Sequence, residues 1–204
     1  MLVVGESGHS NDLYDSQAVK LLIEAHRPDW MVQASKTPAV LAKGKARATA
    51  RGADRVAKLY RQASRARPID CVFNQADTDA VEPSHEKAAA DIEKALADAG
   101  CPGHAVVCAW ELEAWFFLWP EAIEATRSVW SVPKGLRGRD VGQLNDPKSL
   151  MRTQVLIKGA KPQLAYQEKH APEIADQIKL RLGDRDGKSL SFDRFVKQID
   201  ACGA

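Results

Sequence analysis

The sequence has no long apolar run and no segment typical of a secretion signal. Its apolar stretches are far shorter than the ~20 residues that a membrane-spanning helix needs. Met1 is followed directly by Leu2, Val3 and Val4, without a basic region or an extended hydrophobic segment. A secretory signal is therefore not predicted, and we expect a cytoplasmic protein with no membrane partner.

Cysteine is scarce as well. No two of the four cysteines (Cys71, Cys101, Cys108 and Cys202) stand in a C-x-x-C pair. Cys71 and Cys108 fall within apolar runs that are typical of strands. We therefore expect small, buried, reduced thiols. A zinc site made of cysteines and a histidine is the alternative.

The chain is large enough to fold without a covalent or metal staple. Its 204 residues suit one domain of moderate size, or a core with an appendage. Hydrophobic residues make up 45% of the sequence and charged residues 27%, which excludes a largely disordered chain.

The net charge of +2 conceals two segments of opposite sign. Residues 36–67 contain ten lysines or arginines and one acid, a local net charge of +9. Residues 77–124 contain eleven acids and two lysines, a local net charge of −9. The first segment is suited to binding anions, and the second gathers carboxylates.

Strand-like and helix-like patterns alternate through the first part of the chain. This alternation predicts βαβ units and a parallel sheet. We expect strands at residues 2–4, 30–32, 69–73 and 104–109, and helices at about 10–26, 43–66, 84–99 and 111–118. After Trp130 we expect a loop at 132–145, a short helix from Pro147, and helical segments at 163–182 and 192–201.

The fold class predicted from this order is α/β, a parallel sheet flanked by helices with a helical C-terminal appendage. The α/β core should span residues 1–130. Residues 131–204 should form a loop and helical extension packed on that core, so that the whole chain is a single compact unit.

Carboxylates follow three of the predicted strands. Glu6 closes the first strand, Asp77 and Asp79 follow the third, and Glu111 and Glu113 follow the fourth. In parallel α/β sheets, active groups lie at the carboxyl ends of the strands. These residues are therefore the candidate site.

The Asp77-x-Asp79 pair points to a divalent cation. Two carboxylates about 5 Å apart repel each other by about 3 kcal/mol at an effective dielectric constant of 20. Mg²⁺ or Mn²⁺ would offset this repulsion, and both ions prefer oxygen ligands. The alternative is a polar loop that caps the next helix.

The remaining carboxylates have two interpretations each. Glu6 would bind the metal or act as a general base, or it is an ordinary turn residue. Glu111 and Glu113 are two residues apart, so on a helix they should point in different directions and at most one should face the site.

The predicted helix at 43–66 carries a basic stripe. Its cations fall within an arc of about 120° and extend over about 27 Å, which matches a nucleic-acid backbone. Arginine also forms better phosphate contacts than lysine does. A solvated amphipathic helix is the alternative. The residues of the stripe are Arg47, Arg51, Arg55, Lys58, Arg61 and Arg65.

A glutamate after the first strand, followed by D-x-D after a later strand, resembles the TOPRIM domain of topoisomerases, primases and the overcoming-lysogenisation-defect nucleases. The chain is more narrowly similar to an uncharacterised TOPRIM-like family often encoded beside ATPases in bacterial defence loci. The family's glutamate-glycine pair is Glu6-Ser7 here, with Gly8 displaced by one residue. The residues that carry the resemblance are Val4-Gly5-Glu6, Asp77-x-Asp79, Glu113-Ala114-Trp115, Asp146-Pro147-Lys148 and Ser191-Phe192-x-x-Phe195.

The resemblance implies a TOPRIM or Rossmann-like fold with Asp77 and Asp79 as Mg²⁺ ligands. It implies that Glu6 is an acid or base that also contacts the metal, and that Glu113 and Lys148 lie near the site.

Three functions are consistent with these residues. The first is Mg²⁺-dependent cleavage of a phosphodiester in DNA or RNA, as an effector of bacterial defence. The second is a regulatory or effector-binding module that works with an ATPase partner and has no catalysis of its own. The third is phosphoryl chemistry on a small nucleotide.

Overall fold

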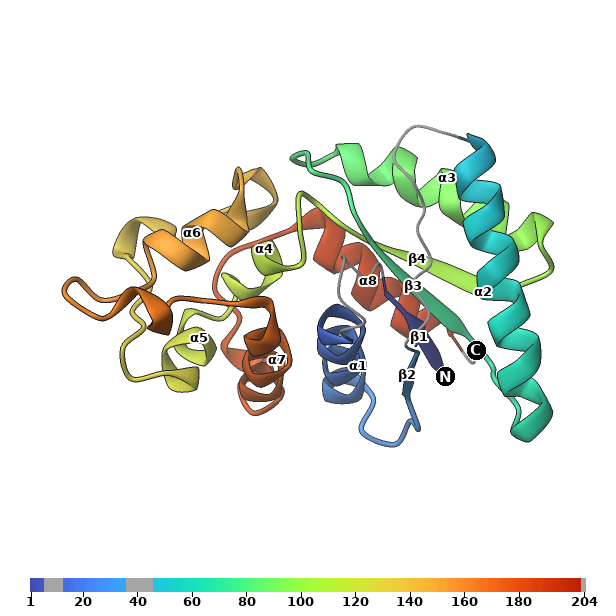
Figure 1. Ribbon diagram of the computed structural model, residues 1–204, viewed down its shortest axis with the longest axis horizontal. Coiled ribbons are helices and arrows are strands. Elements are labelled where there is room, and N and C mark those ends of the chain that lie inside the picture. The colour runs from blue at the N-terminus through green and yellow to red at the C-terminus, as the bar shows by residue number, and fades with distance from the viewer. Residues whose placement is uncertain (6–12, 36–45, 203–204) are drawn as a thin grey trace.

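The computed structural model describes residues 1–5, 13–35 and 46–202 (Figure 1). The predicted site residue Glu6 lies outside these residues, and so does the side chain of Arg47. In the described residues, four parallel strands form one sheet in the order β2-β1-β3-β4. The strands are β1 (Leu2–Val4), β2 (Gln33–Ser35), β3 (Val72–Asp77) and β4 (Gly103–Cys108).

Helices flank the sheet, so the predicted α/β class is confirmed (Figure 1). Among the described helices, none combines the length and the apolar character needed to cross a membrane. The α-helices are α1 (Tyr14–His26), α2 (Ala46–Ala66), α3 (Ser84–Asp98), α4 (Glu113–Phe116), α5 (Pro120–Thr126), α6 (Pro147–Thr153), α7 (Ala171–Lys179) and α8 (Leu190–Ala201). Short 3₁₀ turns cover Lys134–Leu136, Val141–Gln143, Pro162–Leu164, Glu168–His170 and Leu182–Asp184.

Strands β1, β3 and β4 are largely buried on both faces of the sheet. Successive side chains of a strand point to opposite faces, so each of these strands contributes to two clusters. Val3 and Phe73 belong to a hydrophobic cluster with residues of α1 and α8. Leu2 and Val72 belong to a second cluster with residues of α2 and α3. The apolar strands therefore form the centre of a three-layer arrangement.

Residues after position 131 complete the cluster on the α1 side. Helix α7 packs against α1 and α5, and α8 packs against β4. Phe192 and Phe195 of α8 each lie 5.2 Å from the ring of Trp115, measured between ring centroids. These aromatic contacts bury large apolar areas, which favours close packing of α8 on the sheet.

Three predicted elements differ from the structure. The third strand is Val72–Asp77 rather than residues 69–73, because the chain stays extended through Asn74 and Gln75. The second strand is Gln33–Ser35 rather than residues 30–32, and Trp30 instead packs under the guanidinium of Arg27, 4.1 Å from its ring centroid. The predicted helix at 163–182 is two 3₁₀ turns followed by α7. Pro172 is in the first turn of α7, the position where proline is tolerated, so a continuous helix through it was the wrong prediction.

The prediction of four reduced cysteines was wrong for two of them. Cys71, just before β3, and Cys202, just after α8, form a disulfide with their Cα atoms 6.2 Å apart. They are separated by 131 residues in sequence, so no local pattern indicated their pairing. Cys101 and Cys108 are free and buried, as expected.

The outer edge of β4 is covered by side chains. The backbone N–H of Ala105 donates to Glu93 of α3 at 3.3 Å, and its carbonyl accepts from Gln198 of α8 at 3.0 Å. Gln198 also donates to Glu93 at 2.8 Å. The two helices thus satisfy backbone groups that would otherwise be open at this edge.

Candidate functional site

The candidate site begins at the carboxyl end of β3. Asp77 is the last residue of this strand, is half-buried, and is paired in register with Cys108 of β4. Gln75 donates from Nε2 to Oδ1 of Asp77 at 2.9 Å, which orients the carboxylate. Because β2 and β3 lie on opposite sides of β1, the chain reverses its winding direction here. Ligands of doubly wound sheets bind outside the carboxyl ends at such a point.

The turn after β3 is held by the turn after β4. The backbone N–H groups of Thr78 and Asp79 both donate to the carbonyl of Trp110, and Trp110 donates back to Ala80 at 2.7 Å. Asp79 and Trp110 have positive φ angles of 49° and 61°. Such conformations cost about 1–3 kcal/mol in non-glycine residues and are concentrated at functional sites.

This geometry argues against the alternative in which the D-x-D pair caps the following helix. The N-cap residue of α3 is Pro83, and no side-chain hydrogen bond caps that helix among the described residues. Asp79 is exposed. The two aspartates are therefore presented at the end of the sheet.

The structure brings Glu111, Glu113 and Lys148 together. The ammonium of Lys148, at the start of α6, lies 3.4 Å from Glu111 Oε1 and 3.8 Å from Glu113 Oε1. It also lies 3.3 Å from Glu168 Oε1. The expectation that at most one of the two glutamates faces this region was wrong, because α4 begins only at Glu113 and helical spacing does not apply to Glu111.

Glu113 is the most deeply buried acid of the group. Its side chain is 4% exposed, and Oε1 accepts a 2.9 Å hydrogen bond from the hydroxyl of Tyr166. Burial raises the pKa of Glu113 to about 7, against the opposing effect of Lys148. A carboxyl group with a pKa near neutrality can both accept and release a proton at physiological pH.

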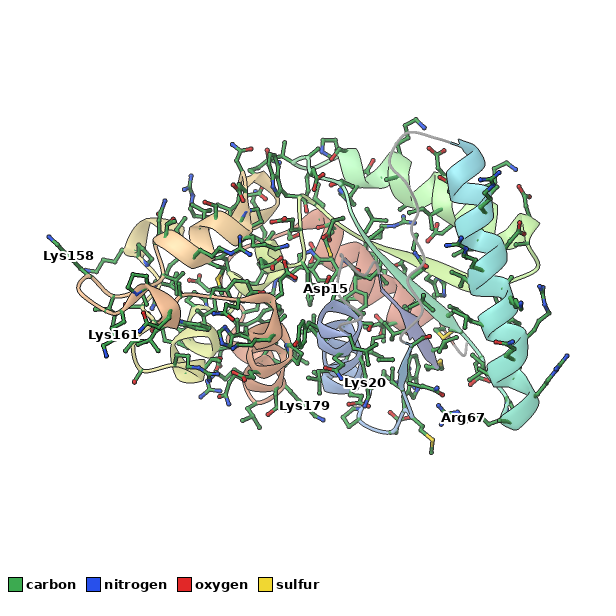
Figure 2. All side chains as sticks on the ribbon, viewed as in Figure 1. Asp15, Lys20, Arg67, Lys158, Lys161 and Lys179 are labelled. Carbon is green, nitrogen blue, oxygen red and sulfur yellow. A yellow bond between two sulfur atoms is a disulfide. The ribbon has the colours of Figure 1, made fainter. Side chains whose placement is uncertain are left out.

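The carboxylates of β3 and β4 converge around one buried thiol. Burial raises the pKa of Cys108, and the negative charges of Asp77, Asp15, Glu113 and Glu111 raise it further. Figure 2 shows Asp15 at the end of α1 that faces the middle of the molecule. These four acids come from different elements and turns and lie near the end of β4. Asp15 was not among the site residues predicted from the sequence.

The chemistry of this donor set fits a hard divalent cation. Among the described residues, no three of these carboxylates have ligand oxygens within 4.8 Å of one another. In that part of the chain, the only three metal-ligating side chains this close together are Cys71, His104 and Cys202. Mg²⁺, however, keeps several waters and commonly takes only one or two carboxylates together with substrate phosphate. Asp77 and Asp79 suit that mode of binding.

The basic stripe lies on the exposed face of α2. Its described members are all exposed: Arg51, Arg55, Lys58, Arg61 and Arg65. Helix α2 starts near the carboxyl end of the sheet and finishes near the amino end (Figure 1). Arg61 donates to the carbonyl of Ala99, before β4, and Arg67 lies beyond the far end of the helix (Figure 2). Arg51 and Arg55 are therefore the described members on the half of α2 nearer the carboxyl edge.

One important carboxylate was missed by sequence reasoning. Glu82, 5% exposed, accepts hydrogen bonds from the backbone N–H groups of Leu190 and Ser191, at 2.9 and 2.8 Å, and from the hydroxyl of Ser189. These bonds lower its pKa, against the effect of burial. Glu82 thus stabilises the N-terminus of α8, more than 100 residues away, and no local sequence signal reveals this.

No family model, curated protein or solved structure matches this chain. The resemblance to TOPRIM domains consequently stays a prediction.

Proposed function

We propose that this chain is a Mg²⁺-dependent nuclease that hydrolyses phosphodiesters of DNA or RNA, acting in the cytoplasm as an effector of bacterial defence. One observation carries the proposal. Asp77 ends β3 and Asp79 follows it at the winding reversal of the sheet, and Glu111, Glu113 and Lys148 gather after the neighbouring strand β4. This is the edge at which parallel α/β sheets bind their ligands.

Each side chain has a role in this proposal. Asp77 and Asp79 would hold Mg²⁺, and Glu6, which lies outside the described residues, is the expected further ligand and acid or base. The metal would supply charge stabilisation for the phosphate. Glu113, with a pKa of about 7, would hold or release a proton, and Lys148 would keep Glu111 and Glu113 in place.

The proposal is tested by a cleavage assay on labelled single- and double-stranded DNA and RNA with Mg²⁺, Mn²⁺ or EDTA. The wild type should cleave in the presence of metal, and the Asp77→Asn/Asp79→Asn double variant should lose at least about 100-fold in rate, since general acid–base and metal contributions are of this size. The matched control is Asp91→Asn/Asp98→Asn, which removes two exposed acids paired with Lys87 and Lys94 on α3.

Activity retained by the control and lost with EDTA would support a metal-dependent nuclease at this site. Equal cleavage by the Asp77/Asp79 variant and the wild type would contradict the site. A lack of cleavage with every substrate and metal would contradict an autonomous nuclease.

The basic stripe is proposed to bind the nucleic-acid backbone. If all six cations contact phosphates of duplex DNA, the logarithm of the binding constant should fall with the logarithm of salt concentration with a slope of about −5. Fluorescence anisotropy at several salt concentrations measures this slope. A slope near zero would contradict binding of phosphates by the stripe. In the cleavage assay, Arg51→Ala/Arg55→Ala should lower the rate more than Arg61→Ala/Arg65→Ala, because Arg51 and Arg55 lie on the half of α2 nearer the carboxyl edge of the sheet.

A regulatory module that works with an ATPase partner is the second candidate. The ion pairs of Lys148 with Glu111 and Glu113 favour this candidate. Charged groups that pair with one another in a buried cluster can have a purely structural role. In that case the exposed cations of α2 would bind an acidic partner surface. Metal-dependent turnover by the isolated chain would count against this candidate.

A further inference from the structure

A second group of ligating side chains lies at the opposite, amino end of the sheet. Cys71 precedes β3, His104 is the second residue of β4, and Cys202 follows α8. One ligand atom from each of the three residues lies within 4.8 Å of the others. Phe73 pairs in register with His104, so the neighbouring strands bring His104 next to the start of β3.

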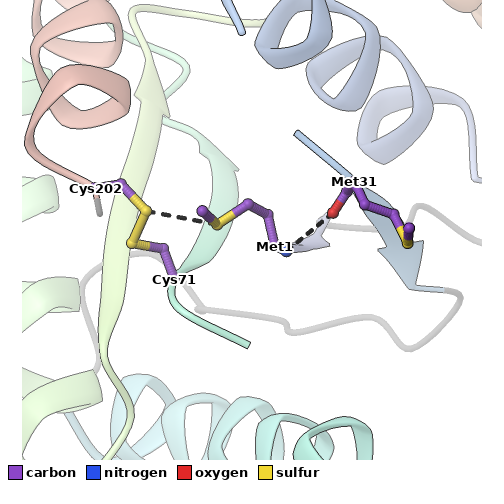
Figure 3. Close-up of a disulfide and its surroundings, with 4 residues drawn as sticks. All are labelled: Met1, Met31, Cys71 and Cys202. Carbon is purple, nitrogen blue, oxygen red and sulfur yellow. Dashed lines mark hydrogen bonds between the residues drawn. A yellow bond between two sulfur atoms is a disulfide. The ribbon is translucent and has the colours of Figure 1, made fainter. Parts of the chain in front are cut away.

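In the structure the two sulfur atoms are joined as a disulfide (Figure 3). The thioether of Met1 lies 3.5 Å from Cys202 Sγ, and the amino group of Met1 donates to the carbonyl of Met31. Cys202 thus has a soft thioether beside its sulfur, and His104 supplies a nitrogen ligand within reach of both cysteines.

The two cysteines are buried, and cavities lie beside two members of the group. A cavity of about 470 Å³ is lined by Cys202 together with Met1, Arg67 and Asp70. A second cavity, of about 490 Å³, is lined by His104 together with His85 and Gln198. A functional metal site requires an entry path, and these two cavities are the routes by which a small reductant or a metal ion would approach the group.

We propose that Cys71, Cys202 and His104 form a redox-gated Zn²⁺ site that is closed as the disulfide and opened by reduction. Thiolate and imidazole ligands are those that Zn²⁺ prefers, and a three-ligand site leaves the fourth tetrahedral position to water. The site is independent of the carboxylate site and of any nuclease activity.

The chemistry balances with a small-molecule thiol as reductant. Two thiol molecules reduce the Cys71–Cys202 bond, giving two cysteine thiols and one molecule of the reductant's disulfide. Zn²⁺ then displaces one proton from each cysteine as two Zn–S bonds form. A small-molecule disulfide reverses the process: it takes up two electrons and two protons to become two thiols, while the Cys71–Cys202 bond re-forms and Zn²⁺ is released.

The experiment is a Zn²⁺ titration of the full chain in its oxidised form and after reduction with a phosphine that is then removed under anaerobic conditions. Competition with a chromophoric chelator measures the affinity. Co²⁺ provides a second readout, because thiolate coordination produces an intense charge-transfer band. We expect one equivalent of Zn²⁺ in the reduced chain and none in the oxidised chain.

Variants identify the ligands. Cys202→Ser should abolish stoichiometric Zn²⁺ binding and the Co²⁺ charge-transfer band, and His104→Phe should weaken Zn²⁺ binding at least tenfold. Cys101→Ser removes another buried thiol, and His85→Phe removes another histidine beside the same cavity, so both should bind like the wild type. Circular dichroism confirms that each variant is folded.

The proposal is overturned if the reduced wild type binds no more Zn²⁺ than Cys202→Ser does. It is also overturned if the disulfide of the folded chain resists the reductant, as shown by thiol alkylation, since the ligands would then never be available.

Discussion

Glu113 combines a buried carboxyl, a tyrosine donor and a lysine partner at one position. Burial favours its neutral form and raises its pKa to about 7, whereas the charge of Lys148 favours its ionised form. The folded chain therefore holds a proton on Glu113 at a pH where the unfolded chain has released it.

The stability of the wild type should consequently fall as pH rises from about 4.5 to about 7. Within this window the folded state binds more protons than the unfolded state, so the free energy of unfolding decreases with pH. Glu113→Gln removes the titrating group. Relative to the wild type, its free energy of unfolding should rise by up to about 3 kcal/mol between pH 4.5 and 8.

Urea unfolding at four pH values in this range measures the difference. Glu121→Gln, at an exposed residue paired with Arg137, is the control and should show little change above pH 5. A pH-independent difference for Glu113→Gln would show that Glu113 is ionised throughout.

Lys148 should matter most when its partners are ionised. Lys148→Gln leaves Glu111 and Glu113 without their shared cation and should lower the free energy of unfolding by about 3 kcal/mol at pH 8. At pH 5 the loss should be smaller, because Glu113 is then protonated. Lys94→Gln, which breaks only the exposed pair with Asp98, should change the free energy of unfolding little at both pH values, because solvent screens that pair. Equal losses for Lys148→Gln at the two pH values would contradict the pairing with Glu113.

The candidate site was predictable only in part at the level of residues. Asp77 and Asp79 were found because a short-range motif followed an apolar strand. Glu113 was proposed because it follows the fourth predicted strand, whereas Lys148 was proposed only through the family resemblance; the structure places the two in contact. Tyr166 and Glu82 carry no local signal, because their partners are distant in sequence and meet only when the chain folds.

At the level of elements, Glu82 connects three separate segments. Its carboxylate holds the first turn of α8, and the 3₁₀ turn Val141–Gln143 packs over it. A Cβ atom added to Gly142 would collide with this carboxylate. The glycine is therefore required by close approach rather than by backbone conformation.

Gly142→Ala should lower the free energy of unfolding by about 1–3 kcal/mol, because the clash must displace a buried and fully hydrogen-bonded group. Gly135→Ala is the matched control, since a Cβ there meets no atom within 4 Å. Guanidinium unfolding compares the two. Similar stabilities would mean that the Glu82 contact yields without cost.

Element prediction succeeded where periodicity was strong and failed where it was weak. Helices α2 and α3 and strand β4 were predicted to within a few residues, because their apolar positions repeat clearly. Strand β3 was expected to end at Phe73, because the polar Asn74 and Gln75 were taken for the start of a turn. Strand β2 has the sequence Gln33-Ala34-Ser35, so the apolar residues before it were mistaken for the strand.

At the scale of the whole molecule, the disulfide joins the start of β3 to the end of α8. The disulfide closes a loop of about 130 residues. A cross-link across a loop of this length removes much conformational entropy from the unfolded state, which stabilises the folded state. In buffer with a chelator, reduction should lower the free energy of unfolding by about 2–5 kcal/mol. Cys202→Ser should match the reduced wild type and should not respond to reductant. Identical unfolding curves with and without reductant would show that the link contributes nothing.

The overall class was predictable because alternation of strands and helices leaves few arrangements. The strand order and the meeting of β3 with α8 were not, because both depend on contacts between distant segments.

The covered edge of β4 has a consequence for self-association. An open edge strand recruits strands from other molecules, but here Glu93 and Gln198 occupy the outward backbone groups of Ala105. A second chain could extend the sheet at this position only by displacing both side chains and exposing the ion pair of Glu93 with Arg194. Two polar side chains from different helices thus act as a barrier to fibre growth at this edge of the sheet.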